Sequence, residues 1–153
     1  TASHAAAVLA NINAEEALPP LLAVLTNQAH PARWVVALNI RGLETNARPA
    51  IPALIRCLQD TNQIVVIAAA VSLGELKLEP ALVVPAMAAS LQHTNAARRA
   101  LAARTLQQFA AEARPAVTGL VDSLSDPDPK VRRSVTNALL KIAPEVLTNA
   151  LPR

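Results

Sequence analysis

Aromatic residues are almost absent from this sequence. They make up 1% of the chain, as Trp34 and Phe109, and there is no tyrosine. Only three glycines occur, which disfavours an all-β protein with many tight turns. Because 52% of the 153 residues are nonetheless hydrophobic, the core must be built from Ala, Leu, Val and Ile. This composition suits closely packed helices, in which Ala lets the helix axes approach and Leu fills the gaps.

Cysteine is represented once, by Cys57. A single cysteine excludes an intramolecular disulfide framework and any zinc or iron–sulfur site built from several cysteines. Uninterrupted apolar runs of about 18 residues are also missing, so the sequence predicts no membrane span.

Most of the twelve prolines lie in pairs or near-pairs, for example Pro19-Pro20, Pro49 with Pro52, and Pro127 with Pro129. Proline is tolerated in the first turn of a helix and disrupts a helix elsewhere. We therefore interpret these prolines as marking the starts of short helices.

An internal repeat organises the whole chain. A register of about 33 residues aligns four units without a gap, and large apolar side chains recur in its columns. The columns are Leu21, Leu54, Met87 and Leu120; Leu25, Leu58, Leu91 and Leu124; Ile40, Leu73, Leu106 and Leu139; and Leu43, Leu76, Phe109 and Ile142. A repeated unit of this length is typical of a solenoid, in which each unit packs on its neighbours.

Each unit reads as two helices joined by a polar turn. The first helix carries an i, i+4 apolar pair behind a proline, as at Leu54 and Leu58. The apolar positions of the second helix in the last unit follow a 3.6-residue period between Val131 and Ile142 and fit no strand period. We therefore predict an all-α solenoid of about four helix–turn–helix repeats.

The run from Leu120 to Ile142 resembles a HEAT repeat, through its Asp126-Pro-Asp-Pro turn, the Val131-Arg opening of the second helix and a later Ala-Leu pair. The resemblance covers nearly the whole chain. It implies a right-handed, armadillo-type α-solenoid whose second helices line the concave side.

The same resemblance implies a ladder of ion pairs between an arginine and an aspartate of successive repeats. The arginine column reads Arg33, Val66, Arg99, Arg132, and the aspartate column reads Asn27, Asp60, His93, Asp126. Because both columns are interrupted, the ladder is expected to be incomplete. The residues expected to take part in it are Asp60, Arg99, Asp126 and Arg132.

The predicted organisation is one HEAT-like domain over residues 1–153. It comprises a partial repeat at 1–17, four repeats at 18–48, 49–81, 82–114 and 115–143, and the start of a further unit at 144–153. Neither end carries the polar cap that usually closes a solenoid. We therefore interpret the sequence as a segment of a longer protein, with short frayed caps as the alternative.

Residue patterns that support catalysis or metal binding are not found. The histidines His4, His30 and His93 have no His-x3-His or Cys-x2-Cys spacing around them, and Cys57 has no histidine near it in sequence. Carboxylates do pair at Glu15-Glu16 and at Asp126 and Asp128. The second pair precedes a helix, where aspartate caps exposed N–H groups. The sequence therefore predicts no catalytic residue, no metal and no cofactor.

A candidate partner-binding face lies opposite the buried stripe of the second helices, as placed by 100° per residue. It contains Trp34 and Leu38 in the first repeat and Ile67 and Val71 in the second, which should adjoin. An outward apolar patch of this kind commonly marks an interface, and tryptophan is the residue most enriched at binding hot spots. The alternatives are that a neighbouring unit or loop covers these residues, or that the helix phase is wrong by one residue.

The corresponding face of the third and fourth repeats carries Arg104 and Arg133. Residues 95–133 hold the whole net charge of +3, which could meet nucleic acid, anionic lipid or an acidic peptide. The first two repeats are nearly neutral and the chain has few aromatics, which disfavours nucleic acid as the partner.

We therefore predict a non-enzymatic scaffold that binds a protein or peptide, another domain of its own chain, or a second copy. The alternatives are a nucleic-acid-binding solenoid and an accessory segment of a larger enzyme, similar to the HEAT-like repeats of bilin lyases.

Overall fold

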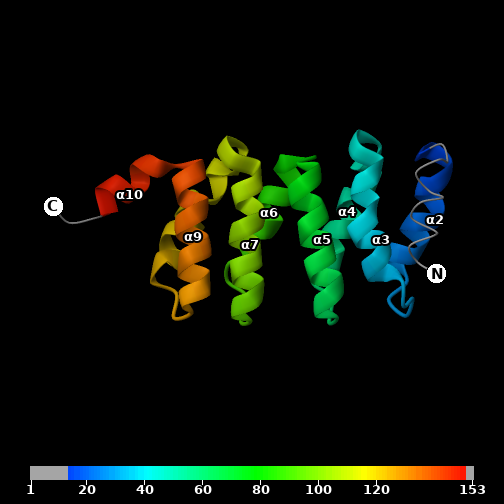
Figure 1. Cartoon of the computed structure of the whole chain (residues 1–153), viewed down its shortest axis with the longest axis horizontal. Helices are drawn as coiled ribbons and strands as arrows, with labels where there is room; N and C mark the ends of the chain where they lie inside the picture. Colours follow the sequence, from blue (N-terminus) through cyan, green and yellow to red (C-terminus); the bar gives the residue numbers. More distant parts are fainter. Residues whose placement is uncertain (1–13, 151–153) are drawn as a thin grey trace. The chain divides into compact units, whose positions relative to one another are not determined.

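The computed structural model describes residues 14–150, with side chains described for residues 16–148. All regular secondary structure in this range is helical (Figure 1). The elements are α2 (Ala14–Thr26), α3 (Arg33–Asn39), η1 (Ile40–Ala50), α4 (Ile51–Cys57), α5 (Gln63–Leu76), α6 (Pro80–Ser90), α7 (Ala96–Phe109), η2 (Ala110–Ala116), α8 (Val117–Asp122), η3 (Ser123–Ser125), α9 (Pro129–Ile142) and α10 (Pro144–Ala150), where η denotes a 3₁₀ helix. None of these helices is long and apolar enough to cross a membrane.

The chain divides into two compact units, with the boundary between Glu79 and Pro80. In the first unit, α3 packs along α5, and α2 and α4 pack against this pair. In the second unit, α7 packs along α9, with α6 against α7 and α8 and α10 against α9. Each unit is therefore a small helical stack in which the second helices, α3 and α5 or α7 and α9, lie side by side (Figure 1).

The second helices of three repeats begin with the same capping arrangement. The side chains of Asn62, Asn95 and Asp128, which occupy one column of the repeat, accept hydrogen bonds from the backbone N–H two residues ahead at 2.9, 2.8 and 2.7 Å. Each cap satisfies an N–H group that a helix start leaves without a partner. The turn residue two positions before each cap, for example Asp60, in turn accepts the N–H of the cap residue. Local hydrogen bonding thus fixes where these helices start.

The second helices α5 and α7 end at residues with a positive φ angle, Lys77 (53°) and Ala110 (50°). The equivalent residue of the first repeat, Glu44 (50°), interrupts the 3₁₀ segment η1 that follows α3. A non-glycine residue rarely adopts this conformation, which breaks the helix and redirects the chain. Each of these residues lies five positions before a predicted repeat boundary, at 49, 82 and 115. The repeat limits and the single domain over 1–153 stay predictions.

The apolar columns of the sequence form the core of each unit. Within the described residues, Leu54, Leu73, Met87, Leu106, Leu120 and Leu139 are at most 1% exposed. The buried stripe predicted for α9, between Val131 and Ile142, is buried throughout. The all-α solenoid class predicted from these columns is therefore confirmed.

The interpretation of every proline pair as a helix start is wrong in two places. Pro19 and Pro20 lie inside α2, and Pro85 lies inside α6. These helices continue past the lost N–H donor because their apolar faces are held by packing. At Pro49 and Pro115 the backbone is instead 3₁₀-helical, because these prolines fall within the segments η1 and η2. Residues 1–13, with His4 and most of the partial repeat predicted at 1–17, lie outside the described residues, as do residues 151–153.

Candidate partner-binding faces

The first unit exposes apolar side chains along α3 and α5. Trp34 on α3 is 40% exposed, and Ile67, its equivalent on α5, is 44% exposed. Leu38 and Val71, one turn further along the same two helices, are half-buried. Because α3 and α5 pack against each other, the four residues predicted from the sequence occupy matching positions on adjoining helices. We call this surface the apolar face of the first unit.

A fifth residue, Ile64, extends this face and was not predicted. It is 57% exposed, the highest fraction among the large apolar residues described. Ile64 lies three residues before Ile67 and seven before Val71, so it shares their side of α5. The spacing of Ile64 is present in the sequence, but the face predicted there begins at Ile67 on this helix.

The residues beneath the apolar face are packed and hydrogen-bonded. On the inward side of these helices, Ile40, Ala69 and Leu73 are buried, whereas Val36, Leu43 and Leu76 are half-buried. The hydroxyl of the fully buried Ser72 on α5 donates to the carbonyl oxygen of Ala37 on α3 at 2.5 Å. A side-chain bond between the two helices thus holds the surface that carries Trp34 and Ile67 in place.

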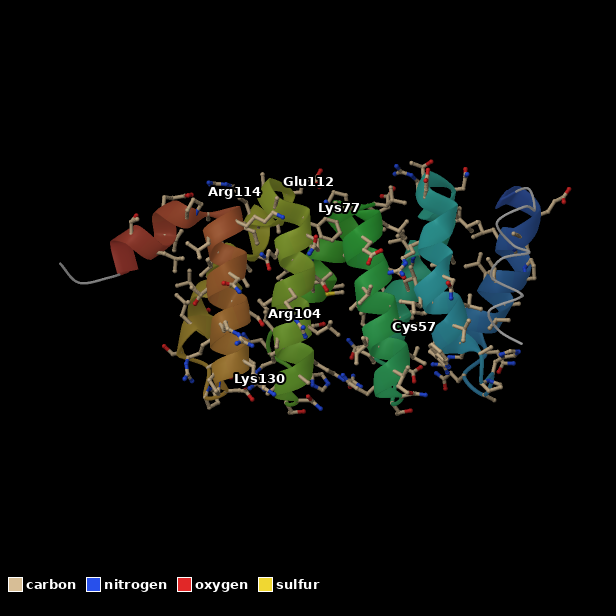
Figure 2. The ribbon with its side chains drawn as sticks, in the orientation of Figure 1. Cys57, Lys77, Arg104, Glu112, Arg114 and Lys130 are labelled. Atoms are coloured by element: carbon tan, nitrogen blue, oxygen red, sulfur yellow. The ribbon has the colours of Figure 1, made fainter. Side chains whose placement is uncertain are left out.

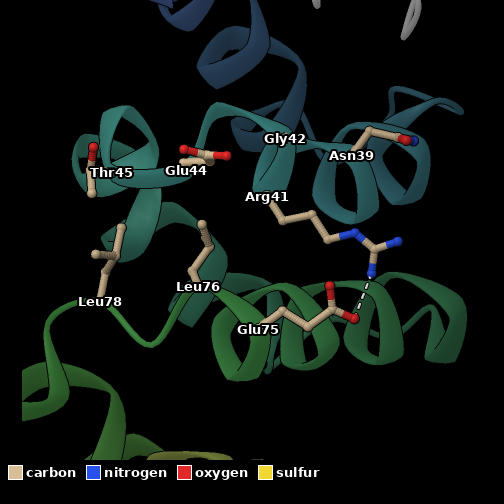
Figure 3. Close-up of a pocket in the computed structure, with 8 residues that line it drawn as sticks. All are labelled: Asn39, Arg41, Gly42, Glu44, Thr45, Glu75, Leu76 and Leu78. Carbon is tan, nitrogen blue, oxygen red and sulfur yellow. Dashed lines mark hydrogen bonds and ion pairs between the residues drawn. The ribbon is translucent and has the colours of Figure 1, made fainter.

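An open cavity of about 400 Å³ lies where α3 leads into η1 and where α5 ends (Figure 3). At its edge the guanidinium of Arg41 and the carboxylate of Glu75 pair at 2.8 Å, and Figure 3 shows this bond bridging the two segments. The other lining residues are Asn39, Gly42, Glu44, Thr45, Leu76 and Leu78. The cavity therefore offers both charged and apolar groups at one end of the first unit.

The equivalent side of the second unit is basic. Arg104 on α7 and Arg133 on α9, both predicted as partner-binding residues, are exposed. Lys130 at the start of α9 is exposed as well, and Figure 2 shows Arg104 and Lys130 on these two helices. Among the described residues, no carboxylate lies within ion-pair distance of Arg104, Lys130 or Arg133.

Two arginine–aspartate pairs link neighbouring repeats inside the units. Arg33 pairs with Asp60 in the first unit, and both side chains are largely buried. In the second unit Arg99 holds Asp126 with two bonds, from Nε at 2.7 Å and from Nη2 at 2.9 Å. The hydrogen bonds from Arg99 hold the pKa of the Asp126 carboxyl below its ordinary value, against the opposing effect of burial. Arg132 makes no such pair with a described carboxylate and instead donates to the backbone oxygens of Asp126 and Pro127.

The two histidines among the described residues have local structural partners. Nδ1 of His30 accepts the N–H of Ala32, and Nδ1 of His93 accepts the N–H of Asn95. Burial raises the pKa of the Cys57 thiol, so this group is protonated and weakly nucleophilic at neutral pH. Within the described residues, no three His, Cys, Asp or Glu side chains gather as a metal site would need.

Comparison with protein families places repeats at both ends of the chain. The family model described as HEAT repeat matches residues 116–146, a segment that contains α8 and α9. The model described as PBS lyase HEAT-like repeat matches residues 2–27. No curated protein matches the chain. HEAT repeats generally mediate protein interactions, and the family generally serves as a non-enzymatic scaffold. The chain is therefore similar to HEAT-repeat proteins in these two segments, and helix pairs recur through both of its units.

Proposed function

We propose that this chain is a non-enzymatic scaffold that binds a short apolar segment of a partner protein on the apolar face of the first unit. The observation that carries the proposal is the exposure of Trp34, Ile64 and Ile67, three large apolar side chains, on two helices that pack side by side. An exposed apolar cluster loses contact with water when a partner covers it, and this supplies the driving force for binding.

The dimensions of the face indicate what it would bind. From Ile64 to Val71 the rise along α5 is about 10 Å, and packed helix axes lie about 10 Å apart. A surface of this size takes two or three side chains, which suits a peptide segment better than the flat surface of a whole domain. The Ser72 bond to α3 holds the two helices together before binding, so less conformational freedom is lost on association.

The single tryptophan gives a direct test. Peptides that bind the chain of residues 1–153 are selected from a random display library, and each is titrated while Trp34 emission is recorded. Binding on the apolar face should shift the emission to the blue as the indole becomes covered. Affinities of variants are measured by the anisotropy of labelled peptides, which does not depend on the indole. Changing Trp34 to Ala or Ile67 to Ser should weaken binding about 30-fold, which is the effect of a hot spot of about 2 kcal/mol.

Leu82 provides the matched control, because it is 50% exposed but lies on α6 of the second unit. Leu82→Ser should bind the selected peptides with unchanged affinity. The proposal fails if the peptides leave Trp34 emission unchanged and bind Trp34→Ala as tightly as the unaltered chain. It also fails if the free monomeric chain already shows the blue-shifted emission of a buried indole.

A second candidate function is that of an accessory segment in a larger enzyme, supported by the PBS lyase HEAT-like match at residues 2–27. A segment that helps such an enzyme to hold its open-chain tetrapyrrole should bind free bilin and induce circular dichroism in the visible bands of the pigment. An absence of induced dichroism at saturating pigment would count against this candidate.

A further inference from the structure

The apolar face of the first unit ends at the open cavity. Arg41 lies seven residues after Trp34, and Glu75 lies four residues after Val71, so the pair continues the exposed side that carries the apolar face. The ion pair between Arg41 and Glu75 lies at the edge of the cavity (Figure 3). A bound segment that runs along α3 and α5 past Val71 therefore reaches the cavity.

The lining of the cavity is negatively charged. Its ionisable residues are Arg41, Glu44 and Glu75, and one cation against two carboxylates leaves a net charge of −1. Arg41 and Glu75 neutralise each other at 2.8 Å. Glu44 is exposed, and among the described residues no cation lies within ion-pair distance of it. Lys77, just after the end of α5, is exposed and does not line the cavity.

Unused hydrogen-bond acceptors line the cavity beside apolar groups. Nδ2 of Asn39 donates to the carbonyl oxygen of Val35 at 2.8 Å, which leaves the side-chain oxygen of Asn39 available as an acceptor. The carboxylate of Glu44 accepts as well. Leu76 and Leu78 are half-buried and give the lining an apolar part. A side chain that joins an aliphatic stem to a cationic donor group matches both kinds of lining.

We propose that the cavity binds a basic side chain, lysine or arginine, of the partner segment whose apolar residues cover the apolar face. The cationic group pairs with Glu44, and the aliphatic stem packs against Leu76 and Leu78. This inference rests on the proposed function, to which it adds the charge of the partner segment and the spacing of its residues.

The length of α5 determines where the basic residue lies in the bound segment. From Ile67 to Glu75 the helix rises by about 12 Å. An extended peptide advances about 3.3 Å per residue. The basic residue therefore lies about three or four positions away from the apolar residue that covers Ile67.

A metal ion fits the cavity less well than a basic side chain does. Within the part of the chain that the structure describes, no three His, Cys, Asp or Glu side chains gather as a metal site would need. One of the two glutamates of the lining is also paired with Arg41 already. A peptide cation needs one carboxylate only, because the apolar face supplies the rest of the affinity.

The test uses the chain of residues 1–153 and a display library of random octapeptides, selected in parallel on the unaltered chain and on Glu44→Gln. Glutamine keeps the shape of the side chain at a position where φ is 50°. Among peptides that Trp34→Ala weakens, selection on the unaltered chain should enrich lysine or arginine at the expected spacing, and selection on Glu44→Gln should not. Glu16→Gln removes an exposed carboxylate on α2 that does not line the cavity, so this control should enrich the same peptides as the unaltered chain.

Affinities are then measured by the anisotropy of labelled selected peptides at low salt. Changing the basic residue of the peptide to glutamine, or Glu44 to Gln, should each weaken binding about fivefold, the upper end for an exposed ion pair. Both changes together should weaken binding no more than either one alone, because they remove the same contact. Glu44→Lys should prefer the peptide in which glutamate replaces the basic residue.

The possible failures separate this inference from the proposed function. Peptides that depend on Trp34 but carry no excess of basic residues would overturn the inference and leave the proposed function standing. Independent, additive effects of the peptide change and of Glu44→Gln would do the same, because they would show that the two groups do not meet. Selected peptides that bind Trp34→Ala as tightly as the unaltered chain would overturn both.

Discussion

Changing Ser72 to Ala should destabilise the first unit by about 1 kcal/mol, as the balance of two opposing effects. The Ser72 side chain is fully buried, and its hydroxyl donates to Ala37 at 2.5 Å and lies 3.3 Å from the carbonyl oxygen of Leu38. Removing a buried donor costs about 1–2 kcal/mol, because the carbonyl that accepted the bond stays out of water. Alanine recovers about 0.5 kcal/mol through its higher helix propensity, which leaves a net cost of about 1 kcal/mol.

The measurement is urea unfolding followed by Trp34 emission, which reports on α3 directly because the chain has one tryptophan. With a urea m value of about 1–3 kcal/mol/M, a cost of about 1 kcal/mol lowers the midpoint by about 0.3–1 M. Thr26→Ala is the matched control in the same unit, since the Thr26 hydroxyl is exposed and donates to Leu22 of its own helix. Its effect should stay within about 0.5 kcal/mol of zero.

Equal shifts in the two variants would refute the reasoning, because they would show that the bond between α5 and α3 adds nothing beyond the loss of a helical hydroxyl. A larger fall for Ser72→Ala together with weaker peptide binding would tie the same bond to the apolar face. The unfolding measurement tests whether the Ser72–Ala37 bond stabilises the first unit, and it requires no partner.

Two further predictions concern the second unit. The pKa of Asp126 lies below its ordinary value of 3.8 when the chain is folded, so its contribution to stability is present above that value and is lost as pH falls through the lower folded pKa. Acid unfolding followed by far-ultraviolet circular dichroism should therefore be less steep below about pH 4 in Asp126→Asn, and an unchanged profile would contradict the pairing with Arg99. Leu106→Ala, at a fully buried site, should cost about 2–5 kcal/mol in urea unfolding, whereas Leu82→Ala, at a half-exposed site, should cost less than about 1 kcal/mol. Similar costs at the two sites would show that the apolar columns of the repeat do not mark the core.

The core was predictable because burial imposes a period on the sequence. A residue such as Leu106 repeats a position held by Leu73 and Leu139, and all three are fully buried. The helix boundaries were harder to predict, because a proline lies inside an α-helix in some places and interrupts α-helical geometry in others. Pro85 sits inside α6, while Pro49 lies in the 3₁₀ segment η1, and only the packing around each one decides which outcome holds.

The candidate apolar face was predictable to the extent that helix phase determines exposure. The two residues placed furthest outward, Trp34 and Ile67, are exposed, whereas Leu38 and Val71 are half-buried because α3 and α5 pack closely along their length. Sequence periodicity shows which side of a helix each residue occupies. It does not show how far a neighbouring helix covers the side chains on that side.

The arginine column shows why residue type alone does not separate structural residues from binding residues. Arg33 and Arg99 bind the carboxylates of Asp60 and Asp126 in the turns of the following repeats, and so join neighbouring repeats within a unit. Arg132 has the backbone bonds of Arg99 but meets no carboxylate within the described residues. In Arg33 and Arg99, a guanidinium that is hydrogen-bonded to the backbone of its own turn binds the aspartate of the following turn. The role of each arginine is therefore set by the surroundings of its Nε and Nη2 groups, and these surroundings became visible only with the positions of Asp60 and Asp126.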